Sequence, residues 1–131
     1  MFDELREINN EIRRKKEYIA ELRAMATSMT LNLSERVQTS PEDRLSNLMC
    51  KIVIAENELD AMIDDFADKK FKAKSDIFSL DNEDWQDIVY MHYIEFKSYP
   101  EIARIKHQKL GAVQKKSQRA IKTLKKRLTS T

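Results

Sequence analysis

Residues 99–127, YPEIARIKHQKLGAVQKKSQRAIKTLKKR, decide the fold of the chain. A short helical segment starts at Pro100, the pattern breaks for a few residues around 106–108, and a long amphipathic helix starts at about Lys109. The second helix has an apolar face because five residues recur at helical spacings: Val113, Ala120, Ile121, Leu124 and Leu128. A short helix followed closely by a longer one with a single apolar face predicts a helix-turn-helix.

A cationic stripe lies on another face of the same helix and consists of Lys115, Arg119, Lys122 and Lys126. Residues 101–131 hold ten Lys and Arg against one Glu, a balance of +9, whereas the whole chain carries +2. Lysine-rich helix faces are usually just solvated, and lysine is also favoured near a helix C-terminus by the helix dipole. A solvated face does not need this segregation of charge, so the stripe predicts double-stranded DNA as a partner.

Local signals support the boundaries and packing of the two helices. Ser98 is placed to cap the first helix, and Glu101, three residues later, can complete a capping box. Ala103 is small where the second helix must cross closely. We therefore expect Val113 to pack back against Ile102 and Ala103.

On these residues the segment resembles region 4 of bacterial sigma factors. It is more similar still to small sigma-like regulators carried by phages of Gram-positive bacteria, a family that includes autolysin-regulator-like late-transcription proteins. The family pattern is an apolar-Arg-Tyr run, then Ser-x-x-Glu-Ile-Ala, then Arg-Ala-Leu-Lys-x-Leu. Residues 91–93 (MHY), 98–103 (SYPEIA) and 119–124 (RAIKTL) match it at the right spacing.

Departures from the family fall at the turn and along the second helix. Lys106 and His107 stand where the family usually has a Leu and a turn Gly, and Lys116 replaces an apolar residue. Lys109 replaces the Ser that usually opens the recognition helix. DNA contact is therefore a firmer expectation than the reading of a particular sequence.

The resemblance implies a phage or prophage transcription regulator, an activator of late genes in the cytoplasm of a host bacterium. Sigma factors melt promoters with a separate domain, and nothing in this chain corresponds to it. The protein is therefore expected to bind promoter DNA and to contact host RNA polymerase. Two alternatives stay open: a packaging protein like a small terminase subunit, and a sigma-like adaptor that binds polymerase and contacts DNA little.

The expected DNA contacts divide along the second helix. Its first turn approaches base edges in helix-turn-helix proteins, which selects Lys109, Leu110, Ala112 and Lys115. Gly111, the only glycine, suits a close approach of backbone to DNA. The expected phosphate contacts come later along the helix, at Lys116, Arg119, Lys122 and Lys126.

The N-terminal half carries two heptad seams. Residues 2–26 form the first, with Leu5, Ile8, Ile12, Lys15, Ile19, Leu22 and Ala26. The second begins near Ser40, a capping residue before Pro41, and contains Leu45, Leu48, Ile52, Ala55, Leu59, Met62, Phe66, Lys69 and Ala73. Neither seam can bury itself alone. The sequence thus predicts an all-α protein with an antiparallel coiled-coil hairpin over 1–74, which we expect to form a homodimer.

Two connections separate the predicted elements. The loop over 27–39 holds Met29, Leu31, Leu33 and Val37, and either covers the end of the hairpin or docks a partner.

A junction over 75–80 opens the helix-turn-helix domain, 75–131. Asp81 is expected to cap a helix over about 83–96, which is apolar on most sides and therefore central. His92 lies near its apolar face and is expected to be a packed histidine rather than a metal ligand.

Composition excludes several function classes. Apolar residues make up 41% of the chain and charged residues 35%, with one Gly and two Pro, which favours helix and leaves little room for β-hairpins. Cys50 has no second thiol to pair with, and no apolar run reaches membrane-spanning length or resembles a leader. The sequence lacks a glycine-rich phosphate loop, a Gly-flanked nucleophile and a His-rich metal set. We therefore expect a non-enzyme without cofactor or metal.

Overall fold

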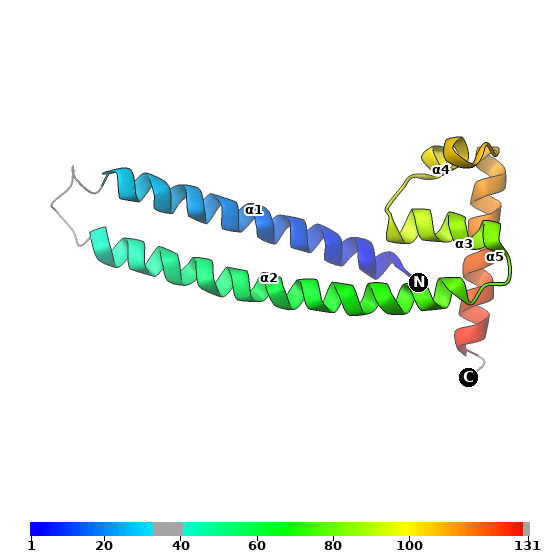
Figure 1. Cartoon of the computed structure of the whole chain (residues 1–131), viewed down its shortest axis with the longest axis horizontal. Coiled ribbons are helices and arrows are strands. Elements are labelled where there is room, and N and C mark those ends of the chain that lie inside the picture. Colours follow the sequence, from blue (N-terminus) through cyan, green and yellow to red (C-terminus); the bar gives the residue numbers. More distant parts are fainter. Residues whose placement is uncertain (33–40, 130–131) are drawn as a thin grey trace. The chain divides into compact units, whose positions relative to one another are not determined.

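The computed structural model of the chain describes residues 1–32 and 41–129, which are helical apart from short connections. The elements are α1 (Asp3–Asn32), α2 (Pro41–Phe78), α3 (Glu83–Val89), a π-helical turn η1 (Tyr90–Ile94), α4 (Tyr99–Lys106) and α5 (Leu110–Thr129) (Figure 1). No strand occurs in these residues, so the predicted all-α class is confirmed. None of the described helices is long and apolar enough to cross a membrane.

Contacts divide the chain into two compact units. Residues 8–65 form the two-helix unit. Residues 1–7 and 66–131 form the C-terminal unit, so the first turn of α1 and the last turns of α2 pack with the C-terminal helices. The chain therefore changes units inside α1 and α2 rather than at a loop.

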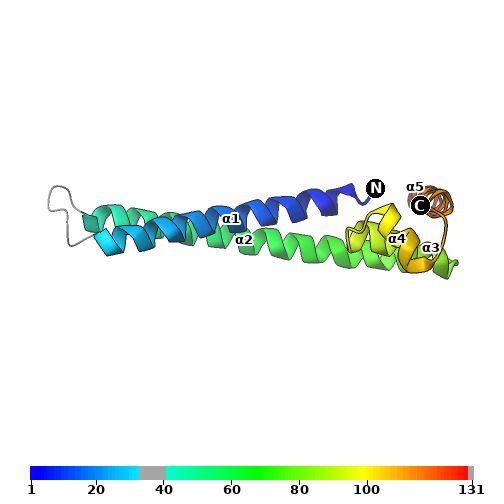
Figure 2. The ribbon, with the colours of Figure 1, turned by 90° about the horizontal axis from the view of Figure 1, so that it is seen from above.

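In the two-helix unit, α1 and α2 run antiparallel and side by side (Figures 1 and 2). Leu22 of α1 packs with Leu48 and Ile52 of α2. Lys15, predicted in a core position of the seam, is only half-buried, and its ammonium pairs with Glu58 at 2.5 Å. That prediction was wrong because a lysine stem can lie along the seam while its charged end reaches a carboxylate at the rim.

Lys69, the other lysine assigned to a core position, behaves in the same way in the C-terminal unit. It is half-buried, and its ammonium lies 2.6 Å from Glu4. The two lysines therefore link the helices through ion pairs and do not leave buried charges without partners. Exposed pairs of this kind contribute about 0–1 kcal/mol each, so apolar packing carries most of the pairing energy.

α1 runs through residue 32 and not to about 26, so the predicted loop begins too early. The hydroxyls of Thr27 and Thr30 donate to the carbonyls of Arg23 and Ala26 one turn back, at 3.0 and 2.9 Å, within the continuing helix. Met29 packs against the cluster around Leu22. The rest of the predicted loop, residues 33–39, and the capping role of residue 40 lie outside the described residues.

The main core of the C-terminal unit gathers side chains from α1, α2, the α3–η1 segment and α5. Its buried members are Phe2, Leu5, Ala73, Ile77, Leu80, Val89, Ile94, Ala120 and Leu124. The junction predicted over 75–80 is wrong for its first part, because α2 continues to Phe78 and Ile77 is fully buried. Leu128 was predicted on the apolar face of α5 but is 47% exposed, because it lies beyond the last buried turn.

The central helical segment has two parts rather than one. Asn82, not Asp81, caps α3, because the Asn82 side chain accepts a hydrogen bond from the Trp85 N–H at 3.2 Å. The helix then widens into η1, which ends at Ile94, and Phe96 follows with a left-handed φ of 60°. Ile88 and Val89 are fully buried, while the aromatic side chains are half-buried around the main core, as expected for a central segment.

α4 begins and ends as its sequence predicts. The Ser98 hydroxyl accepts a hydrogen bond from the Glu101 N–H at 3.3 Å. Ile102, Ala103 and Val113 pack together with Ile88, which confirms the predicted contact between the two helices. α5 lies across α3 in Figure 1, so α3 supports both later helices.

The turn between α4 and α5 spans residues 107–109 and depends on His107. This residue adopts the left-handed conformation, with φ 54° and ψ 43°, that usually selects glycine. The N–H of His107 bonds to the Arg104 carbonyl and that of Gln108 to the Ala103 carbonyl, at 3.3 and 3.0 Å, as in a Schellman motif. The backbone thus takes the turn without the glycine that the related pattern has there.

We expect His107→Gly to raise the free energy of unfolding by about 1 kcal/mol, because glycine removes the strain of a side chain in the left-handed region. Urea denaturation at an unchanged m-value measures this difference. His107→Ala is the matched control and should not gain stability. A less stable His107→Gly protein would mean that the histidine side chain itself stabilises the turn.

Candidate nucleic-acid interface

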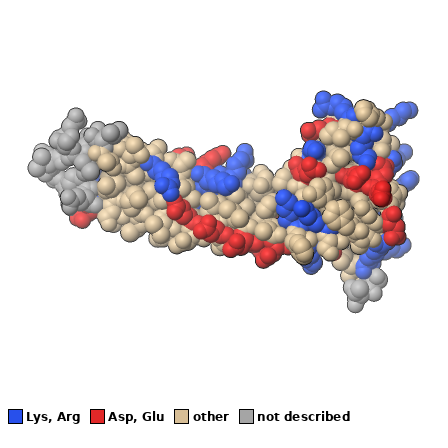
Figure 3. Space-filling model, in the orientation of Figure 1, with Lys and Arg blue, Asp and Glu red and all other residues tan. Residues whose placement is uncertain are grey.

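The cationic stripe of α5 is exposed along its whole length. Lys115, Arg119, Lys122 and Lys126 face solvent, whereas Val113, Ser117, Ala120 and Leu124 on the other side of the helix are buried. Figure 3 shows basic side chains gathered over α4 and α5. Within the described ranges, none of the four stripe cations has a carboxylate partner. The stripe is therefore positioned to meet an external anion.

The first turn of α5 presents a mixed surface. Lys109 and Gly111 are exposed, Leu110 is 41% exposed, and Ala112 is half-buried. A Cβ added at Gly111 would meet nothing within 4 Å, so the fold itself does not require glycine there. A glycine in a helix costs about 1 kcal/mol relative to alanine.

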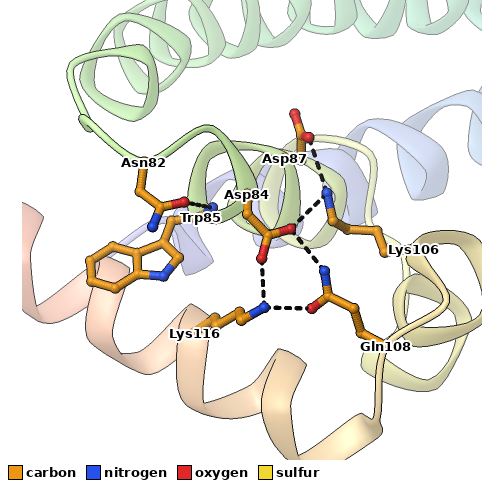
Figure 4. A network of polar contacts seen from close by, with 7 residues as sticks. All are labelled: Asn82, Asp84, Trp85, Asp87, Lys106, Gln108 and Lys116. Carbon is orange, nitrogen blue, oxygen red and sulfur yellow. Dashed lines mark hydrogen bonds and ion pairs between the residues drawn. The ribbon is translucent and has the colours of Figure 1, made fainter.

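Lys116, predicted to contact phosphate, has partners inside the protein. Its ammonium donates to Asp84 Oδ2 at 2.7 Å and to Gln108 Oε1 at 2.9 Å (Figure 4). Lys106 reaches the same carboxylate, 2.9 Å from Asp84 Oδ1, and lies 3.0 Å from Asp87 Oδ2. The four residues Asp84, Lys106, Gln108 and Lys116 form what we call the Asp84 network. It joins α3 to both sides of the turn.

The network shifts the proton affinity of its members. Partial burial raises the pKa of Asp84, but hydrogen bonds from Lys116, Lys106 and Gln108 outweigh that effect and lower the pKa from 3.8 to about 2. Partial burial also disfavours the charged form of Lys106, yet its hydrogen bonds and charge interactions with Asp84 and Asp87 raise its pKa. Asp84 is therefore held as an anion at neutral pH.

A second polar cluster fixes α4 on α5 at the far side of the turn. Ser117 is 1% exposed, and its hydroxyl lies 2.9 Å from that of Tyr99. The Tyr99 ring stacks on His92, with centroids 3.9 Å apart, and His92 Nδ1 lies 2.8 Å from the Lys97 carbonyl. Burial lowers the pKa of His92, as expected for a packed histidine. In the described part of the chain, no three His, Cys, Asp or Glu side chains gather to hold a metal ion.

Sequence reasoning missed Asp84 and Gln108 as members of this site. The acidic residues at the start of α3 were explained by the helix dipole, and partners 24 and 32 positions away leave no periodic signal. The available signal was the pair of lysines, Lys106 and Lys116, at positions where the related pattern is apolar. Two lysines at the edge of the core indicate that a carboxylate lies nearby to pair with them.

Asp84→Asn should lower the free energy of unfolding at pH 7 by on the order of 1 kcal/mol, because two lysines lose their shared carboxylate. The folded pKa of about 2 lies below the ordinary 3.8, so the stability that Asp84 contributes is present above pH 4 and is lost as pH falls towards 2. Urea denaturation from pH 7 to pH 2 should therefore show the two proteins converging. Asp87→Asn, at an exposed carboxylate that contacts only Lys106 of the network, is the matched control. A constant difference across the range would show that the Asp84 charge is not what stabilises the unit.

Comparisons with known proteins add no constraint to this interface. The chain matches no protein-family model, no curated protein and no solved structure. Its function must therefore be argued from the residues and geometry described above.

Proposed function

We propose that the chain is a DNA-binding transcription regulator whose α4–turn–α5 segment acts as a helix-turn-helix. The observation that carries the proposal is the exposed stripe Lys115, Arg119, Lys122 and Lys126, without internal carboxylate partners, on the face of α5 opposite its buried side chains. A cationic helix face of this kind neutralises phosphates along a groove. The same face includes the first turn of α5, which can approach base edges.

The arrangement of α3, α4 and α5 supports this proposal. Recognition helices of helix-turn-helix proteins are held by a preceding helix that crosses the DNA backbone. Here α4 packs on α5 through Ile102, Ala103 and Val113, and a three-residue turn connects them. The motifs quoted above resemble region 4 of sigma factors, and on that basis we assign a phage or prophage late-gene activator that contacts host RNA polymerase.

Roles within α5 follow from exposure. Lys109, Leu110 and Lys115 are the proposed base-reading side chains, and the exposed apolar surface of Leu110 suits a thymine methyl group. Gly111 would let the helix backbone approach the DNA. Arg119, Lys122 and Lys126 are the proposed phosphate contacts. Lys116 stays out of this set because its ammonium is held by Asp84.

Assembly is assigned to the proposed coiled-coil hairpin, and in particular to α2, which runs from the two-helix unit into the C-terminal unit. Apolar side chains are exposed along α2 at Met49, Val53, Ile54, Ile63, Phe71 and Phe78. Phe71 is 76% exposed, and Phe78, two turns later, shares its side of the helix. Such exposed apolar surface favours a second copy of the chain. The same property suits a packaging protein like a small terminase subunit, which is the alternative function.

Replacing single cations separates the proposed roles. Arg119→Ala removes a phosphate contact, so binding to target and to random duplex should weaken together and the salt slope should fall by about 1. Lys115→Ala removes a base contact, which should cost about 1–3 kcal/mol on the target and narrow its advantage over random duplex. Fluorescence anisotropy at several salt concentrations measures both effects. Wild-type affinity in both mutants at low salt would favour the adaptor function, and a promoter-fusion assay would separate regulation from packaging.

The assembly proposal predicts a homodimer whose stability depends on Phe71. Phe71→Glu should shift the protein to monomer because it places a charge in the buried contact. Light scattering across micromolar to millimolar concentrations measures the shift. A wild-type monomer throughout this range contradicts the proposed dimer.

A further inference from the structure

The carboxylate of Asp84, on α3, contacts residues on both sides of the turn between α4 and α5 and one residue within it. Lys106 is the last residue of α4, Lys116 lies on the second turn of α5, and both ammonium groups meet this one side chain from α3 (Figure 4). Gln108, within the turn, donates to Asp84 Oδ1 at 2.9 Å and accepts from Lys116. Each oxygen of the carboxylate therefore has a charged donor.

The two lysines differ from the exposed stripe in access as well as in pairing. The side chain of Lys106 is 15% exposed and that of Lys116 33%, whereas the stripe cations face solvent. A phosphate that took over either ammonium would remove one of the two charged donors of the Asp84 carboxylate, whose side chain is only 30% exposed. A partly desolvated anion that loses a charged donor is costly, so this exchange is unfavourable.

We propose that Asp84 is an internal competitor for phosphate, which keeps Lys106 and Lys116 out of the DNA contact and limits non-specific affinity. This inference rests on the proposed DNA binding by α5. A cation that releases a counterion to phosphate adds about 0.9 to the salt slope. A cation already neutralised by a fixed carboxylate releases none, and the carboxylate also repels the duplex. Asp84 thereby lowers the sequence-independent affinity for duplex DNA without any contact to DNA.

The test measures affinity for a random-sequence duplex against salt concentration, for folded variants checked by circular dichroism. Lys122→Gln should lower the slope by about 1, while Lys116→Gln should leave it unchanged, although both remove one positive charge from α5. Asp84→Asn should steepen the slope by up to about 2 and tighten random binding several-fold. Asp87→Asn changes the net charge by the same amount as Asp84→Asn. Its effect on the salt slope should be smaller, because Asp87 pairs with Lys106 but not with Lys116.

Equal losses of slope in Lys116→Gln and Lys122→Gln overturn the proposal, even if Asp84→Asn fails to fold. An unchanged slope in folded Asp84→Asn overturns it as well. If the wild type binds no duplex at low salt, the proposed DNA binding is wrong. Elution from immobilised heparin then tests separately whether Asp84 competes with an external polyanion for the two lysines. Asp84→Asn should elute at higher salt than Asp87→Asn, and equal elution would show that Asp84 does not withhold the two lysines from polyanions.

Discussion

The packing of α5 across α3 is the constraint on which the C-terminal unit depends. α5 is too polar to be buried on more than one side, and its few apolar residues, with Ser117, line that side. Once Val113 and Leu124 are buried, the helix period forces the cationic stripe to the opposite, outward face. The exposed charges are therefore a consequence of the same pattern that anchors the helix. This packing also places α4, because Ile102 and Ala103 of α4 are buried against Val113 and Ile88.

Polar contacts then take the places that apolar residues and glycine hold in the related sequence pattern. His107 takes the left-handed position of the turn, and the Asp84 network braces the turn from α3. Tyr99 and Ser117 make a further link on the other side. Such contacts specify geometry more than they add stability, since half-exposed ion pairs contribute little net energy. These contacts hold the angle between α4 and α5. They also pair Lys106 and Lys116 with Asp84, so these two lysines do not extend the cationic stripe.

The sequence predicted the helical class, the cap at Ser98, the contact of Val113 with Ile102 and the exposure of the stripe, because each depends on local spacing. It placed the end of α1 too early, since the apolar seam was followed only to Ala26 while the helix continues to residue 32. It assigned Lys15 and Lys69 to the core because periodicity does not show where a long side chain ends. The Asp84 network escaped because its partners are distant in sequence. The roles of Lys115 and Arg119 on DNA stay predictions.

The outward face of α5 is proposed to bind duplex DNA. Amide NMR spectra of the full chain, recorded during titration with a short duplex at low salt, test this proposal. The signals of residues 109–126 should shift or broaden, this effect should weaken steeply as salt is added, and the signals of residues 8–65 should change little. Spectral changes confined to residues 8–65, or no change at any DNA concentration, would contradict it.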